Sequence, residues 1–118
     1  MVKGVAVVWM PAEDFDRAVG FYEETLGLEV TMREDGWAEL DANGLTIGIN
    51  GRESAGAGTE GGPVVAFQLE GGLDATVAAL KDKGVAFPAE ASEHPWGRLA
   101  TFKDSEGNNL QLYEPPKR

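Results

Sequence analysis

Residues 14–30 decide the fold, and they read Asp-Phe-Asp-Arg-Ala-Val-Gly-Phe-Tyr-Glu-Glu-Thr-Leu-Gly-Leu-Glu-Val. Five apolar residues recur at i, i+3, i+4, i+7 and i+11, which predicts one buried helix face: Phe15, Ala18, Val19, Tyr22 and Leu26. Asp14 can cap the start of this helix, and Gly27 can end it because glycine readily adopts positive φ. The segment therefore predicts a helix that leads directly into a strand at residues 28–32.

One strand precedes this helix and three follow it. Residues 5–10 are rich in β-branched and aromatic residues and stop at Pro11, which is typical of a strand. Further strands are predicted at 37–41 and 45–50, joined by a turn of hairpin composition, Asp41-Ala-Asn-Gly44. The first half of the chain is thus a strand, a helix and three strands.

The same order is predicted again in the second half of the chain. Strands are expected at 64–69, 85–87, 99–103 and 110–114, and Leu73, Val77 and Leu80 mark a helix that ends at Gly84. Val7 and Val64 are 57 positions apart, whereas Gly48 and Gln111 are 63 apart. We therefore expect six extra residues between Phe87 and Leu99, in a loop that holds His94, Pro95 and Trp96. The prediction is a single domain (1–118) of two modules, 4–50 and 63–115, with a Gly-rich linker at 51–62.

Composition excludes several classes of protein. The 118 residues include no cysteine, which excludes a disulfide scaffold, a Cys-ligated metal and a thiol nucleophile. The formal net charge of −10 disfavours nucleic acid as a partner, because a phosphate backbone would repel it. The longest apolar run, residues 5–10, is too short to span a membrane. We expect a soluble cytoplasmic domain.

Alternation within the strands assigns their two faces. The uniformly apolar set packs beneath the helices, and the opposite set carries Thr, Asn, Gln, Glu, Tyr and Trp, as expected of a surface that meets ligand or solvent. An ordinary solvated sheet face is the alternative. We refer to this second set as the ligand face. It comprises Val7, Trp9, Trp37, Glu39, Thr46, Val64, Gln68, Gln111 and Tyr113, with His94 and Trp96 on a loop at its rim.

The segments 14–30 and 102–114, together with the internal repeat, resemble the vicinal oxygen chelate superfamily of glyoxalases, bleomycin resistance proteins and extradiol dioxygenases. This resemblance implies an α+β fold of two tandem βαβββ modules with curved mixed sheets, commonly assembled as a homodimer. Metal-dependent members carry His, Gln or Glu at four positions. Here those positions correspond to Val7, Gly48, Val64 and Gln111.

Those four residues do not form a metal site. Valine and glycine have no donor atom, and the side-chain oxygen of Gln111 cannot hold a divalent cation alone. We therefore expect no metal and no cofactor. Glu39 and His94 are the weak candidates for a displaced ligand or a catalytic base, although a lone His is more often solvated.

The primary hypothesis is a metal-independent protein that binds a planar or cationic small molecule on aromatic side chains. Its predicted binding residues are Trp9, Trp37, Glu39, Gln68, His94, Trp96, Gln111 and Tyr113. The alternative is a lyase, isomerase or oxygenase that uses a divalent metal or a metal-free Glu39 or His94 base. Trp9 and Trp37 can also simply fill the sheet face. Trp96 is the most specific prediction, because binding residues concentrate on loops held by a rigid scaffold.

Overall fold

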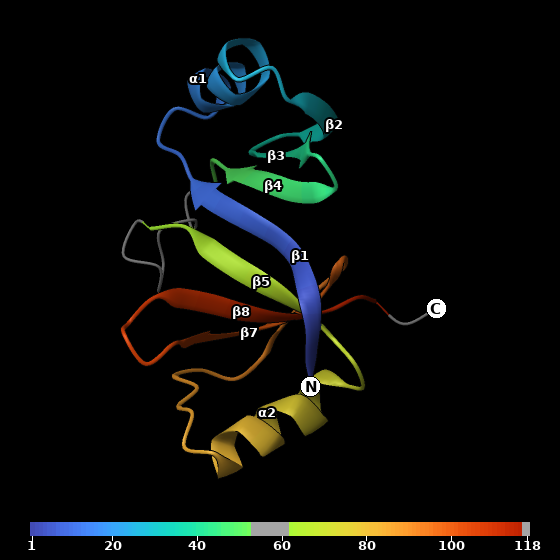
Figure 1. The fold of residues 1–118 in the computed structure, drawn as a ribbon, viewed down its shortest axis with the longest axis vertical. Coiled ribbons are helices and arrows are strands. Elements are labelled where there is room, and N and C mark those ends of the chain that lie inside the picture. Colours follow the sequence, from blue (N-terminus) through green and yellow to red (C-terminus); the bar gives the residue numbers. More distant parts are fainter. Residues whose placement is uncertain (53–61, 117–118) are drawn as a thin grey trace. The chain divides into compact units, whose positions relative to one another are not determined.

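The computed structural model describes residues 1–52 and 62–116. Its backbone forms two compact units (Figure 1). The first unit is Val7–Val64, and the second combines Met1–Ala6 with Val65–Arg118. Strand β1 (Val2–Pro11) contributes residues to both. Within the linker predicted at 51–62, residues 53–61 lie outside the described part of the chain.

The first unit orders its strands β2-β3-β4-β1. Strands β2 (Glu29–Glu34), β3 (Trp37–Ala42) and β4 (Leu45–Asn50) are joined by antiparallel pairing, whereas β1 and β4 run parallel. The parallel pairing is possible because helix α1 (Phe15–Gly20) carries the chain back across one face. That face is apolar, as predicted: Ala38, Leu40 and Ile49 are fully buried with Val19 of α1.

The observed helix α1 ends at Gly20, whereas the apolar pattern predicts a helix over residues 15–26. After Gly20 the chain forms a π-helical turn, η1 (Phe21–Thr25), in which Leu26 N–H donates to the Phe21 carbonyl at 3.0 Å. This wider turn rotates Leu26 away from the core, so the prediction that Leu26 is buried is wrong, and its exposed fraction is 53%. Leu28 packs against the core in its place.

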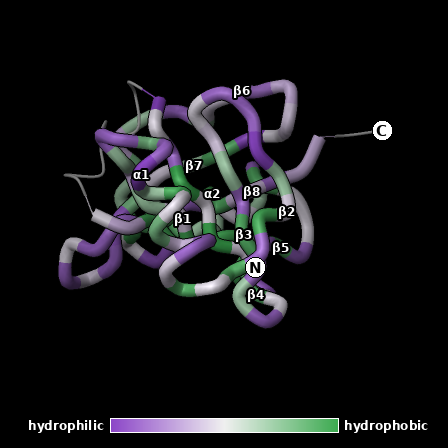
Figure 2. Tube along the Cα trace, turned by 90° about the horizontal axis from the view of Figure 1, so that it is seen from above, coloured by the Kyte–Doolittle hydropathy of each residue, from purple (hydrophilic) through white to green (hydrophobic). Residues whose placement is uncertain are grey.

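The second unit repeats this plan with the strand order β5-β8-β7-β6, and the first residues of β1 lie beside β5. Its strands are β5 (Val64–Leu69), β6 (Ser92–His94), β7 (Gly97–Lys103) and β8 (Asn109–Glu114). Helix α2 (Leu73–Asp82) covers the apolar face, where Leu73, Ala100 and Leu112 are buried. Hydrophobic residues lie mostly in the middle of the molecule, and the turns at its edge are mostly hydrophilic (Figure 2).

The strand predicted at 85–87 is absent from the described residues. Val85 and Phe87 still pack into the core, and the Phe87 ring lies 5.1 Å from that of Phe102, but the segment carries no strand pairing. A short apolar segment indicates burial, but burial does not require a strand. An irregular segment can also bury its side chains. The strand that pairs with β7 on the side away from β8 is β6, which begins seven residues after Val85.

The position of β6 also corrects the predicted loop around His94. His94 is the last residue of β6 and pairs with Gly97, so Pro95 and Trp96 form a two-residue hairpin turn. Gly97 has φ +137°, and a Cβ there would collide with the Glu114 carbonyl, so the turn requires glycine. The loop prediction failed because a proline after His94 suggested an interruption, whereas the strand ends one residue before it.

Pairing registers confirm the repeat and refine its offsets. Trp9 pairs with Gly48, and Ala66 pairs with Gln111, which preserves the predicted offsets of 57 and 63. Glu39 opposite Gly48 corresponds, however, to Thr101 opposite Gln111, an offset of 62. Five of the six extra residues therefore precede Leu99, and the sixth lies in the β7–β8 loop. The prediction that all six precede Leu99 is wrong by one residue.

Among the described residues, no helix has the length and apolar character needed to cross a membrane.

Candidate functional site

The ligand face of the first unit is dominated by two tryptophans. Trp9 is 7% exposed and clusters with Val64, and Val7 and Trp37 pack against this pair. The predicted orientation of β1 is therefore correct, since Val7 and Trp9 lie on one face while Met10 packs in the core beneath α1. Burial of Trp9 shows that it fills the sheet face and cannot offer a free stacking surface.

Trp37 occupies the space above Gly48. A Cβ built on Gly48 would lie 2.5 Å from Cη2 and 2.8 Å from Cζ2 of Trp37, far inside van der Waals contact. On the same side of the ring as Cζ2, the indole donates Nε1–H to Glu39 Oε2 at 2.9 Å. Residues 37 and 39 lie on the same face of β3, because alternate residues of a strand point the same way. The local sequence therefore brings the donor and the acceptor together.

The four positions that hold a metal in other members of the resembled superfamily do not fit one here. Val7 and Val64 belong to the apolar cluster around Trp9, and the ring of Trp37 excludes any side chain at position 48. Gln111 is buried and its Nε2–H donates to Thr101 Oγ1 at 3.3 Å. The described residues also contain no group of three His, Asp or Glu side chains that could hold a metal ion. The residues at these four positions therefore do not fit a metal centre.

In the second unit the predicted residues Gln68, Gln111 and Tyr113 lie on adjacent strands. Gln68 pairs with Tyr113 across β5 and β8, and its Oε1 lies beside the bare backbone of Gly4, where a Cβ would be 3.2 Å away. Gln68 is exposed, whereas Gln111 is buried. This face is therefore lined by amide and hydroxyl groups, in contrast to the indoles of the first unit.

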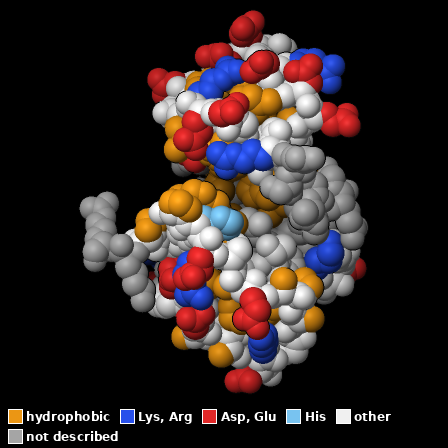
Figure 3. Space-filling model, turned by 180° about the vertical axis from the view of Figure 1, so that it is seen from behind, with side chains coloured by type: hydrophobic (Ala, Val, Ile, Leu, Met, Phe, Trp, Pro, Cys, Tyr) orange, Lys and Arg blue, Asp and Glu red, His pale blue; other side chains and the backbone are white. Residues whose placement is uncertain are grey.

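His94, Trp96 and Tyr113 form a stack of rings on the second unit. The rings of His94 and Trp96 are 4.4 Å apart and nearly parallel, with an interplanar angle of 3°, and Tyr113 lies 6.3 Å from Trp96. The Tyr113 hydroxyl donates to the Trp96 carbonyl at 2.8 Å. Trp96 stays 45% exposed, and hydrophobic side chains border the single histidine at the surface (Figure 3). Trp96 is thus accessible but already stacked within the protein.

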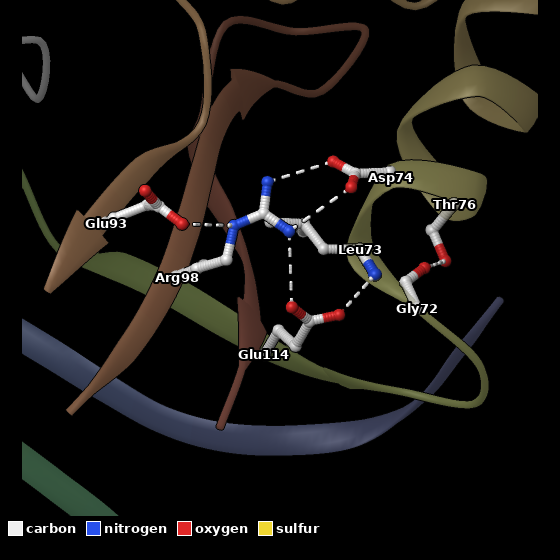
Figure 4. Close-up of polar contacts among 7 residues, drawn as sticks. All are labelled: Gly72, Leu73, Asp74, Thr76, Glu93, Arg98 and Glu114. Carbon is white, nitrogen blue, oxygen red and sulfur yellow. Dashed lines mark hydrogen bonds and ion pairs between the residues drawn. The ribbon is translucent and has the colours of Figure 1, made fainter. Parts of the chain in front are cut away.

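Sequence reasoning missed a charged cluster centred on Arg98. Its guanidinium contacts Asp74 at 2.9 Å, Glu114 at 3.3 Å and Glu93 at 3.7 Å (Figure 4). The hydrogen bond to Asp74, reinforced by Glu114, raises the pKa of Arg98 above its ordinary value. Glu114 also accepts from the Leu73 N–H at 2.7 Å and so caps α2, whose N-cap residue is a glycine.

This cluster has a structural explanation and only a weak sequence signal. Gly72 precedes α2 without a capping side chain, which implies a cap supplied from elsewhere, but Glu114 lies 41 residues after Leu73. Nothing in the local pattern identifies Glu114 as that cap. The cluster fastens α2 to β7 and β8 and lies at the end of the helix-covered side, so we assign it to stability.

Two βαβββ units with matching registers define the class of protein to which this chain is similar. The sequence matches the model of the Glyoxalase/Bleomycin resistance protein/Dioxygenase superfamily over residues 4–112, and the chain belongs to this family. The predicted resemblance and α+β fold are confirmed.

Solved structures support the fold. Methylmalonyl-CoA epimerase from Mycobacterium tuberculosis is 24% identical, with 98% of this chain and 90% of that chain covered and a TM-score of 0.69. A superfamily member from Vibrio splendidus is 14% identical, with coverage of 98% and 100% and a TM-score of 0.65. The Mn(II)-bound glyoxalase from Novosphingobium aromaticivorans is 18% identical, with coverage of 95% and 38% and a TM-score of 0.65. No curated protein matches the sequence.

Proposed function

We propose that this protein is a metal-independent binder of a planar or cationic small molecule. The observation that carries the proposal is the ligand face of the first unit, where Trp37 covers Gly48 and two valines replace donor side chains. Aromatic faces stack on flat ligands and attract cations, whereas a metal needs several oxygen or nitrogen donors.

Charge favours a cation among such ligands. The chain carries a net charge of −10, and the carboxylate of Glu39 lies at the edge of the Trp37 indole. A negative field raises the local concentration of cations at low ionic strength. The exposed ring of Trp96 is a separate proposed contact on the second unit, because a hairpin turn can approach a bound molecule without unfolding the sheet.

Elemental analysis and a binding screen test this proposal together. Protein purified without chelator is analysed for nickel, zinc, iron and manganese, then screened by thermal shift against antibiotics, aromatic metabolites and coenzyme A esters. We expect no stoichiometric metal and an increase in Tm with at least one flat or cationic compound, because a ligand of the native state stabilises it by mass action. One equivalent of tightly bound metal would overturn the proposal.

The second candidate is an enzyme of the same superfamily, since its structural relatives include methylmalonyl-CoA epimerases and a glyoxalase. Without a metal, this candidate relies on Glu39 or His94 as a base. In the structure Glu39 accepts from Trp37, and His94 Nε2 lies 2.9 Å from Ser92 Oγ, so each potential base already has a polar neighbour. Turnover of a screened compound that survives chelation and is lost in Glu39→Gln would favour this candidate.

The assembly we propose is a cytoplasmic homodimer. The first unit exposes Phe21, Leu26 and Met32, which are large apolar side chains that a second copy could cover. The absence of cysteine is compatible with a reducing compartment. Sedimentation equilibrium at micromolar concentration should return twice the chain mass of 12.6 kDa, and a monomer alone would contradict the dimer.

A further inference from the structure

The indole of Trp37 is held in the manner of a bound ligand. One edge of the ring lies over bare backbone at Gly48, where a Cβ would meet Cη2 at 2.5 Å. Any residue other than glycine at position 48 would displace the ring. The backbone here therefore has the shape of a recess for a flat aromatic group.

The polar contact lies on the same side of the ring, because Nε1 and Cζ2 are both bonded to Cε2. Glu39 Oε2 accepts the Nε1–H of Trp37 at 2.9 Å in a half-buried setting. Hydrogen bonds to an ionised acceptor are about twice as strong as neutral ones. The recess thus selects a flat ring with an N–H donor at one edge.

Trp37 is also the residue of this face whose side chain can rotate out of its place over Gly48. Trp9 is 7% exposed and Val64 is fully buried, whereas Trp37 is only partly buried and opens β3 directly after the turn at Asp35 and Gly36. Its side chain is attached at a strand end, where rotation about χ1 does not disturb the middle of the sheet. Rotation of the indole away from β4 would leave an apolar wall, the bare backbone of Gly48 and the carboxylate of Glu39.

We propose that Trp37 is a built-in occupant of the binding site, and that a ligand enters by displacing its indole. The ligand class is an aromatic amine or N-heterocycle whose N–H donates to Glu39 and whose ring covers Gly48. This inference rests on the proposed ligand-binding function and deepens it: the ligand occupies the place of the Trp37 indole instead of stacking on that ring. Displacement also lowers the observed affinity, since only the fraction of molecules with Trp37 rotated out can bind.

Tryptamine tests the competition, because it carries both an indole N–H and an ammonium group. Its affinity is measured by calorimetry for wild type, Trp37→Phe and Trp37→Ala. Trp37→Phe keeps a ring but loses the bond to Glu39, so it should bind more tightly than wild type, and Trp37→Ala should gain roughly tenfold or more over wild type. Leu99→Ala is the matched control, because Leu99 occupies the corresponding register in the second unit, and it should bind like wild type.

A second measurement separates displacement from simple filling of an engineered cavity. The Nε1–H resonance of Trp37, assigned by its loss in Trp37→Phe, should shift when wild-type protein is titrated with tryptamine. In the Trp37→Ala background, Glu39→Gln should weaken the binding of both tryptamine and neutral indole about tenfold, because each donates its indole N–H to the carboxylate.

Equal affinity in wild type and Trp37→Ala, an unchanged Trp37 resonance at saturation, or an equal gain in Leu99→Ala would each overturn the inference. Trp37→Phe keeps the test available if Trp37→Ala does not fold. Binding of another compound in the metal-free screen, without any gain in the Trp37 variants, would reject the inference and leave the proposed function standing. Stoichiometric metal would reject the proposed function itself.

Discussion

The two units place different chemistry at the same register. In the first unit Gly48 lies beneath Trp37 and beside Glu39, whereas the corresponding position of the second unit is Gln111, bonded to Thr101. Leu99 stands where the first unit has Trp37. One face is therefore aromatic with a carboxylate and the other is a neutral hydrogen-bonded pair.

This difference shows that the repeat preserves backbone pairing and leaves side-chain chemistry free to diverge. The parallel pairings of β1 with β4 and of β5 with β8 have the same register, because the cores beneath α1 and α2 require it. A shift of one residue would turn every apolar side chain outward. The opposite face is less uniformly apolar, so it carries the differences between the units.

The largest expected effect comes from filling the recess of the first unit. Gly48→Gln copies the residue of the second unit but forces Trp37 out of place, and overpacking of this kind should lower the free energy of unfolding by about 3 kcal/mol. Chemical denaturation measures the loss. Gly20→Ala is the control, because a Cβ there meets no atom within 4 Å, and it should be neutral or slightly stabilising. An unchanged stability in Gly48→Gln would show that the indole moves freely.

The next largest loss of stability comes from removing the N-terminal caps of the two helices, which are supplied in different ways. Asp14 caps α1 from its own segment by accepting the Arg17 N–H at 3.1 Å, whereas α2 depends on Glu114 of β8. Glu114→Ala removes this cap and one partner of Arg98, and should cost about 2 kcal/mol. Asp14→Ala should cost about 1 kcal/mol, because it removes only a local cap. Equal losses in urea denaturation would contradict the assigned double role of Glu114.

The third effect is on binding and not on stability, and it compares the two hairpin turns that precede β3 and β7. The first turn ends at Gly36, and the second presents Trp96 from the corresponding hairpin. Trp96→Ala should weaken binding of a screened ligand by about 1–3 kcal/mol, the usual cost of one stacking face. Its Tm should change little, because Trp96 is largely exposed. Loss of folding with residual binding intact would instead identify Trp96 as a structural residue.

The smallest effect is a pH dependence in the loop between β7 and β8. Asp104 accepts from the Asn108 side chain and from the backbone of Asn108 and Glu106, which lowers its pKa below the ordinary 3.8. A carboxyl with a lowered pKa in the folded state stabilises that state above its unfolded pKa, and the contribution is lost as pH falls through the folded pKa. Asp104→Asn should therefore flatten the decline in Tm below about pH 4.

The sequence by itself determined the two βαβββ units, the faces of their strands and the absence of donors at Val7, Gly48 and Val64, because periodicity and residue chemistry are local properties. Tertiary structure decided the rest. The capping of α2 by Glu114 depends on a partner 41 residues away from Leu73. The π-turn that exposes Leu26 and the pairing of His94 with Gly97 join residues close in sequence, but the apolar pattern does not encode them. The contact of Trp37 with Gly48 follows from the β3–β4 register, which packing of both faces fixes together.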